Sequence, residues 1–180
     1  MASTNSDAGW NLDSFLGAYD MIWDKSSNMI NFSEGVVGMQ YSLSFFFCTG
    51  LPASVIKEGE RQIYKKTGER KYEMHVLRKD PKYNIIADFE LGKKTVKNLP
   101  NNQTLSYTLE MTGATTLKGT YEWDFGDHMA AFGIVNTFKP DGSGFFNDVT
   151  VTKPKDLRAH APFYRIKEEN ISGPITLGPS

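Results

Sequence analysis

Residues 104–152 read TLSYTLEMTGATTLKGTYEWDFGDHMAAFGIVNTFKPDGSGFFNDVTVT, and this stretch decides the fold. Its first segment places a large apolar residue at every second position: Leu105, Tyr107, Leu109 and Met111. A two-residue period is typical of a β-strand that turns one face toward an apolar interior, and a helix does not keep that period. The alternation resumes at 116–124 and again at 128–135, and residues 145–152 close the set. The stretch therefore predicts four consecutive strands.

Short polar segments separate these strands. Thr112, Gly113 and Ala114 interrupt the first run, and residues 125–127 (Phe-Gly-Asp) interrupt the second. Residues 139–144 (Lys-Pro-Asp-Gly-Ser-Gly) carry the strongest turn signal in the chain. Strands joined by short turns form an antiparallel meander, and this spacing indicates a sandwich or a barrel.

The rest of the chain continues the strand pattern. Alternation predicts further strands, which we place at residues 15–23, 28–33, 36–48, 69–77, 83–91 and 160–167. Residues 53–66 allow two interpretations, a helix or a strand whose part 61–66 pairs with 69–77; Gly59 would weaken a helix interior and favours the hairpin.

These elements predict an all-β fold with little helix: a single antiparallel meander barrel of about 8–10 strands, whose closure removes exposed sheet edges. We expect an N-terminal arm at 1–13, the barrel at 14–167 and a C-terminal tail at 168–180.

Composition narrows the possible functions. A chain of 180 residues with 39% hydrophobic residues is long enough for one core, and its formal net charge of -1 disfavours a nucleic-acid partner. The single cysteine, Cys48, excludes an intramolecular disulfide, and the three histidines have no metal-site spacing, so we expect no metal and no cofactor. Neither a signal peptide nor a membrane-spanning stretch is visible, which predicts a cytoplasmic location; the oligomeric state is left open.

The apolar strand faces are rich in aromatic rings and thioethers, which line pockets for small apolar molecules well. The expected ligand-binding residues are Trp23, Tyr41, Phe45, Met74, Phe89, Tyr107, Met111, Tyr121 and Trp123. For each of these, filling a core is the alternative interpretation. The sequence thus favours a barrel that binds a small hydrophobic molecule.

The alternative function is a cofactor-independent enzyme of the isomerase or cyclase type. An ionisable group in an apolar pocket acquires a shifted pKa and then serves as a general acid or base. The candidate catalytic residues are Tyr41, His75, Asp88, Tyr107 and Arg165, with Asp88 first because it lies in the middle of a strand.

Three segments resemble the calycins, the superfamily of lipocalins and fatty-acid-binding proteins. Residues 15–19 (Phe-Leu-Gly-Ala-Tyr) resemble the opening strand, residues 89–93 (Phe-Glu-Leu-Gly-Lys) resemble a mid-barrel segment of the fatty-acid-binding branch, and Trp123-Asp124 falls where that branch often has a Trp-Asp pair. The matches are spread over residues 15–167 and imply a ligand-binding barrel.

The chain also departs from this superfamily. Tyr19 stands where Gly-x-Trp usually has its tryptophan, and the carboxylate-binding Arg-x-Tyr of the last strand is absent. Here the last strand reads Tyr164-Arg165, and adjacent strand residues point to opposite faces. A fatty-acid carboxylate site is therefore not carried over to this chain.

Overall fold

The computed structural model describes residues 9–22, 59–81, 84–99, 102–124, 126, 129–153 and 157–175. Trp23, Tyr41 and Phe45 lie outside these residues, as do the strands expected at 28–33 and 36–48 and the first part of 53–66. The described residues carry ten strands and two short 3-10 helices: η1 Asp13–Phe15, β1 Gly17–Met21, β2 Arg61–Gly68, β3 Lys71–Leu77, β4 Ile85–Glu90, β5 Lys94–Leu99, β6 Gln103–Met111, β7 Thr116–Asp124, β8 Met129–Phe138, β9 Gly144–Lys153, β10 Leu157–Ile166 and η3 Glu168–Asn170.

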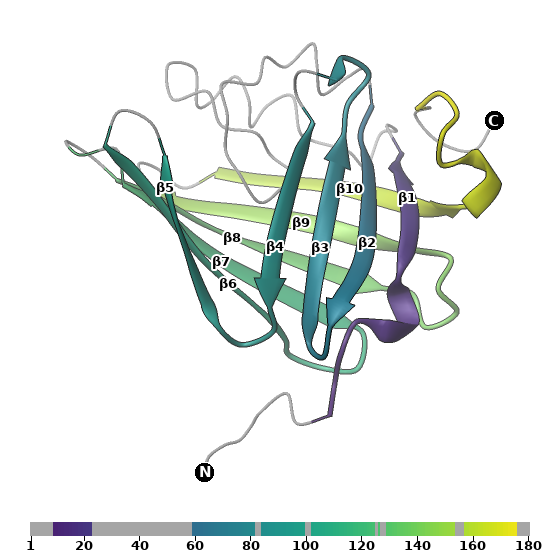
Figure 1. The fold of residues 1–180 in the computed structure, drawn as a ribbon, viewed down its shortest axis with the longest axis horizontal. Helices are drawn as coiled ribbons and strands as arrows, with labels where there is room; N and C mark the ends of the chain where they lie inside the picture. The colour runs from purple at the N-terminus through teal and green to yellow at the C-terminus, as the bar shows by residue number, and fades with distance from the viewer. Residues whose placement is uncertain are drawn as a thin grey trace.

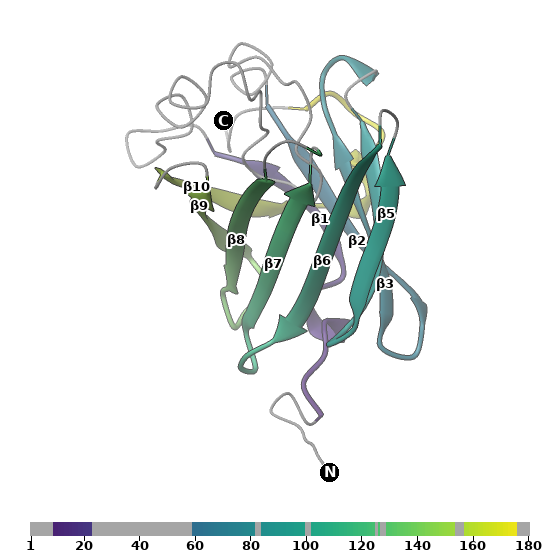
Figure 2. The same ribbon diagram turned by 90° about the vertical axis from the view of Figure 1, so that its left-hand side faces the viewer.

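All the strands belong to one antiparallel sheet in the order β4-β3-β2-β1-β10-β9-β8-β7-β6-β5. Consecutive strands are neighbours in the sheet, except β4 and β5, which form its two ends. β1 pairs with both β2 and β10. The sheet curls so that β1–β4 form one wall and β6–β10 cross behind them (Figure 1). The view turned by 90° shows β5 beside β6 at the other end of the sheet (Figure 2). The prediction of an all-β meander barrel is confirmed.

Strict alternation of buried and exposed residues builds the barrel wall. On β7 the odd-numbered residues from Leu117 to Trp123 are buried and the even-numbered ones are not. On β8 the even-numbered residues from Ala130 to Phe138 are buried. The buried set forms one continuous core inside the barrel. The meander predicted for residues 104–152 is therefore present as β6, β7, β8 and β9.

The region from residue 59 to 77 is the expected hairpin. β2 pairs with β3 from Arg61 opposite Leu77 to Gly68 opposite Lys71, with a bulge between Lys66 and Gly68. The turn uses Glu69 and Arg70, and Arg70 has a φ of 60°. The helix interpretation is wrong for the described residues 59–66.

The first strand begins later than the alternation predicts. Phe15 closes a 3-10 turn, in which its N–H donates to the Leu12 carbonyl at 2.9 Å. Gly17 then has a φ of 127°, a backbone conformation that side chains other than hydrogen rarely allow. The strand therefore starts at Gly17, and Phe15 enters the barrel from its end rather than from its wall.

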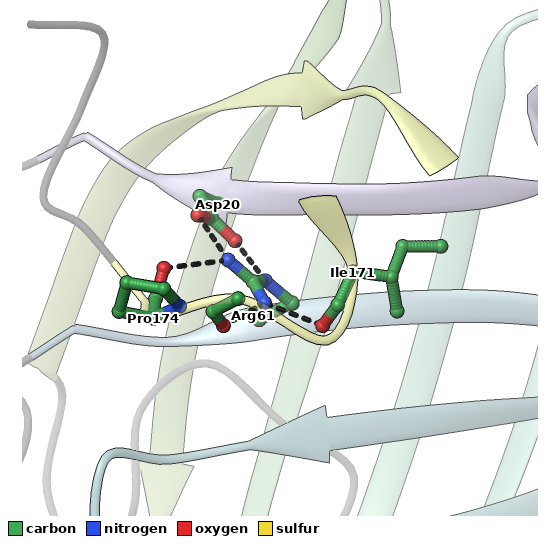
Figure 3. A network of polar contacts seen from close by, with 5 residues as sticks. Asp20, Arg61, Ile171 and Pro174 are labelled. Atoms are coloured by element: carbon green, nitrogen blue, oxygen red, sulfur yellow. Dashed lines mark hydrogen bonds and ion pairs between the residues drawn. The ribbon is translucent and has the colours of Figure 1, made fainter. Parts of the chain in front are cut away.

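The C-terminal segment packs on the outside of β1 and β2 through a buried arginine. The Arg61 guanidinium donates to both carboxylate oxygens of Asp20, at 2.7 and 2.9 Å. It also donates to the carbonyls of Ile171, Gly173 and Pro174, at 2.7, 2.9 and 3.1 Å. Figure 3 shows Arg61 held between Asp20 and this segment. Both charged side chains are at most 3% exposed. They therefore satisfy each other's charge in place of water.

We predict that Asp20→Asn destabilises the fold by about 3 kcal/mol, because it leaves the buried guanidinium without its counter-charge. Urea unfolding measures the change. The control is Glu90→Gln, which breaks the solvent-exposed pair of Glu90 with Lys93 and should leave the unfolding midpoint nearly unchanged. Equal midpoints for Asp20→Asn and the native chain would contradict the prediction.

A second prediction concerns alkaline pH. Burial raises the pKa of Tyr19 and of Tyr72 from the ordinary 10.0 to about 12. Between pH 10 and 12 the unfolded chain releases phenol protons that the folded chain retains, so the contribution of these two phenols to stability is fully present below pH 10 and is lost as pH rises through this window. Urea unfolding at pH 8, 10 and 11 tests this, and phenolate absorbance reports the titration. The double variant Tyr19→Phe/Tyr72→Phe should show a shallower fall, and an equally steep one would contradict the assignment.

Candidate functional site: the barrel interior

Aromatic rings fill the end of the barrel nearest η1. The Phe15 ring stacks on Phe138 with centroids 4.5 Å apart, and Phe145 stacks on Phe163 at 4.6 Å. Tyr19 lies against Phe145 at 5.0 Å, and its hydroxyl donates to the Phe15 carbonyl at 2.8 Å. These rings come from η1, β1, β8, β9 and β10, so they join distant elements. The barrel has a packed aromatic floor at this end.

Arg165 seals the same end. Its Nη1 donates to the Leu16 carbonyl at 2.7 Å, and its Nη2 donates to the Tyr19 hydroxyl at 2.7 Å. Its Nε donates to the Gly142 carbonyl in the β8–β9 turn. The guanidinium carbon also lies 4.8 Å from the centre of the Tyr19 ring, a cation–π arrangement. Arg165 therefore holds three chain segments together, which is a structural role.

A second aromatic group lies on the wall formed by β6, β7 and β8. Tyr107 on β6, Tyr121 on β7 and Phe132 on β8 are stacked, with centroids 5.5 Å and 4.8 Å apart. Gly119 makes room for this stack, since a Cβ there would lie 2.7 Å from a carbon of the Tyr121 ring. All three side chains are buried on the inward faces of their strands.

Polar side chains form a continuous hydrogen-bonded chain across the interior. Asn147 on β9 donates to Asn136 on β8, and Asn136 donates to the Tyr64 hydroxyl on β2, each at 2.6 Å. Tyr64 donates to Gln62 at 3.2 Å, and Gln62 donates to Glu60 at 2.6 Å. Glu60 pairs with Arg78 at 2.6 Å, with both side chains fully buried. We call Asn147, Asn136, Tyr64, Gln62, Glu60 and Arg78 the polar chain.

Burial sets the protonation of its members. The pKa of the Tyr64 phenol is raised well above its ordinary value, mainly by burial, so the hydroxyl keeps its proton and remains a donor. Burial lowers the pKa of Arg78, whereas the Glu60 carboxylate raises it. An arginine stays charged despite such a shift, and the adjacent carboxylate supplies its counter-charge. The polar chain thus ends in a buried ion pair.

Six of the predicted ligand-binding residues are described, and all six are buried on inward faces: Met74, Phe89, Tyr107, Met111, Tyr121 and Trp123. They come from β3, β4, β6 and β7, and the barrel brings them into one interior. Trp123 is held by its Nε1–H, which donates to Gln103 at 3.1 Å. The structure places these residues together; their role in binding stays a prediction.

The candidate catalytic residues do not converge. The Asp88 side chain points outward from β4 and pairs with Lys97 at 2.7 Å, with 64% of the Asp88 side chain exposed. That hydrogen bond lowers the pKa of Asp88. His75 faces outward on β3 and contacts Glu73 at 3.0 Å. Tyr107 faces inward, and burial raises its pKa. Arg165, the remaining described candidate, lies beside Tyr19 at the end of the barrel and is engaged in the contacts given above. Asp88 and His75 therefore do not reach an enclosed molecule.

The sheet has its two ends at β4 and β5, and side chains bridge between them. The Tyr107 hydroxyl donates to the Asp88 carbonyl at 2.7 Å, and the Lys97–Asp88 ion pair spans the same gap. A cleft of about 310 Å³ lies at this place, lined on the inward side by Tyr72, Phe89 and Thr95. The backbone hydrogen bonds of the barrel wall are thus interrupted between β4 and β5, and side chains bridge this gap.

A larger hollow of about 500 Å³ lies outside the barrel, between β1, β2 and the C-terminal segment. It is lined by Asp20 and Arg61, whose polar groups bond to each other and to the segment's carbonyls. We therefore regard this hollow as part of the packing of that segment and place the candidate site inside the barrel.

Sequence reasoning missed the polar chain. Asn136 follows Ile134 and precedes Phe138 on the inward face of β8, and Asn147 lies between Phe145 and Val149 on β9. A polar residue that interrupts an apolar face at the correct period is a readable signal. Its partners could not be read, because Tyr64 is 72 residues away from Asn136.

Comparisons with solved structures agree with this architecture. A Schistosoma mansoni fatty-acid-binding protein, solved with arachidonic acid, is 15% identical, with 87% of this chain and 99% of that chain covered and a TM-score of 0.60. A mutant of the fluorescent protein UnaG is 14% identical over 87% and 99% of the two chains, with a TM-score of 0.61. The REP1-NXSQ fatty acid transporter is 10% identical over 86% and 97%, with a TM-score of 0.59.

No protein-family profile and no curated protein sequence matches the chain. The structural likeness shows the fold alone: this protein has the barrel fold seen in fatty-acid-binding proteins. The resemblance noted in the sequence is confirmed at that level. Within the described residues, no helix has the length and apolarity needed to span a membrane, and no three potential metal ligands cluster.

We predict that Tyr107→Phe loosens the β4–β5 gap, because it deletes the buried hydrogen bond to the Asp88 carbonyl. The expected cost is about 1 kcal/mol in the free energy of unfolding, with faster amide hydrogen exchange in β4 and β5. Lys97→Met is the control, since it removes only the exposed ion pair and should change both readouts little. Unchanged exchange in Tyr107→Phe would refute the bridging role.

Proposed function

We propose that this protein binds a small, mainly apolar molecule inside the barrel, against the aromatic stack of Tyr107, Tyr121 and Phe132. The observation that carries the proposal is the inward lining, which combines stacked rings and thioethers with a few hydrogen-bonded polar groups. Ligand sites in proteins combine these two features, the apolar surface supplying affinity and the polar groups supplying orientation.

The structural neighbours support the same proposal. Two of them are named for fatty acids, one as a binding protein solved with arachidonic acid and one as a transporter. Their likeness to this chain is one of fold, so the ligand class here is argued from this chain's own residues. The expected cytoplasmic location also stays a prediction.

The enzyme alternative receives no specific support from the described residues. Asp88 and His75 face outward, and the inward Tyr107 hydroxyl donates to a backbone carbonyl. Binding without conversion is therefore the function that the geometry favours.

The test uses the neutral apolar fluorophore N-phenyl-1-naphthylamine, whose emission rises on transfer into an apolar site. We expect the native chain to bind it, and Phe132→Leu to weaken binding about threefold to tenfold through loss of a stacking surface. Phe146→Leu is the matched control, because Phe146 lies on the outer face of the neighbouring strand and is 40% exposed.

Circular dichroism confirms that both variants fold. Native mass spectrometry of the freshly purified protein, followed by solvent extraction, then identifies any molecule that copurifies. Failure of the native chain to bind the fluorophore, or equal loss in both variants, would overturn the proposed site.

A further inference from the structure

The polar chain has a direction, and Glu60 fixes it. A carboxylate paired with a guanidinium can only accept hydrogen bonds, so Gln62 must present its NH₂ group to Glu60. The Gln62 carbonyl oxygen then faces Tyr64 and accepts its hydroxyl proton. Each hydrogen bond fixes the direction of the next one. The oxygen and the nitrogen of each side-chain amide can therefore be assigned from the donors and acceptors around them.

The same reasoning continues to the end of the chain. The Tyr64 oxygen, having given its proton to Gln62, accepts from the NH₂ group of Asn136. The Asn136 oxygen accepts from the NH₂ group of Asn147. The group left at the far end is therefore the Asn147 carbonyl oxygen, an acceptor.

That oxygen has no donor among the described residues. The residues beside it on the inward face are Phe145 and Val149 along β9 and Ala161 across β10, and none of these side chains can donate. Asn136, opposite it on β8, uses its NH₂ group on Tyr64. Asn147 is fully buried, so bulk water does not satisfy it. Buried acceptors of this kind are rare in native proteins, because leaving one unpaired is costly.

We infer that Asn147 Oδ1 accepts a hydrogen bond from the ligand, and that the ligand is a neutral apolar molecule carrying a hydroxyl or N–H group. This inference rests on the proposed function and names its ligand class. An anionic ligand does not fit, because a carboxylate has no proton to donate to Asn147 Oδ1 and the two oxygens would repel each other. The guanidinium of Arg78 does not change this, since Glu60 balances its charge.

The test compares three ligands with the same twelve-carbon chain: 1-dodecanol, its methyl ether 1-methoxydodecane, and dodecanoate. Each displaces N-phenyl-1-naphthylamine from the native chain at pH 7.5. We expect dodecanol to bind about fivefold to tenfold more tightly than the ether, the size of one net hydrogen bond, and dodecanoate to bind more weakly than dodecanol.

Variants at Ala161 and Asn147, with a control at Ala87, test whether the preference for dodecanol arises at Asn147 Oδ1. Ala161→Ser places a hydroxyl directly across from Asn147, where it can donate to the unsatisfied oxygen from within the protein. It should remove most of the preference for dodecanol over the ether while preserving the fold. Ala87→Ser, which adds the same group at a buried inward position on β4, is the matched control and should keep the preference. Asn147→Leu should abolish the preference as well.

The outcomes separate the two proposals. Equal affinities for dodecanol and the ether in the native chain would overturn this inference and leave the proposed function standing, with an internal water molecule as the donor to Asn147. Tightest binding of dodecanoate, or a preference that survives Ala161→Ser and Asn147→Leu, would also overturn it. If neither the fluorophore nor any of the three ligands binds, the proposed function fails and the inference with it.

Discussion

Hydrogen-bonding groups inside a barrel have to be satisfied from inside, and this constraint explains the arrangement of the interior. The described inward faces are apolar except for the polar chain and a few groups at the ends and at the gap. The polar chain starts at the Glu60–Arg78 ion pair and crosses from β2 to β8 through the hydrogen bond between Tyr64 and Asn136. Its bonds connect strands on opposite walls, so it fixes their relative positions as well as satisfying its own members. The aromatic floor below it needs no such partners and packs by shape.

Buried polar groups on the outer face of the barrel wall are also satisfied by hydrogen bonds, but their partners come from the C-terminal segment. Arg61 and Asp20 are buried on the outside of the wall only because the C-terminal segment covers them, and that segment supplies three carbonyls to the guanidinium. On most strands one face is solvated, but β1 is buried on both faces. A strand with two buried faces loses the clean alternation of polar and apolar residues, so alternation is a weaker guide to the bounds of β1.

The sequence predicted strands best where one face of the strand is apolar and the other is exposed to solvent. The four strands of the meander and the 61–77 hairpin were readable for that reason, and the inward lining residues followed from them. β5 was missed because Lys94–Leu99 is an edge strand with polar residues on both faces. Asp88 was ranked first among the catalytic candidates for its place in a strand, but its parity turns it outward to Lys97. Asn136 bonds to Tyr64 on a distant strand, which local patterns do not contain, and Asn147 joins the same network through Asn136.

β1 and β10, the first and last strands among the described residues, lie side by side in the middle of the sheet order, and Tyr19 and Arg165, which bond across this seam, are 146 residues apart. β1 is synthesised before β10, so the β1–β10 pairing is absent until β10 has been made. Closure waits for residues 163–166 to emerge, when β10 reaches β1. Closure of the barrel therefore depends on a pairing between segments that lie far apart in the sequence, and it cannot precede the synthesis of residues 163–166.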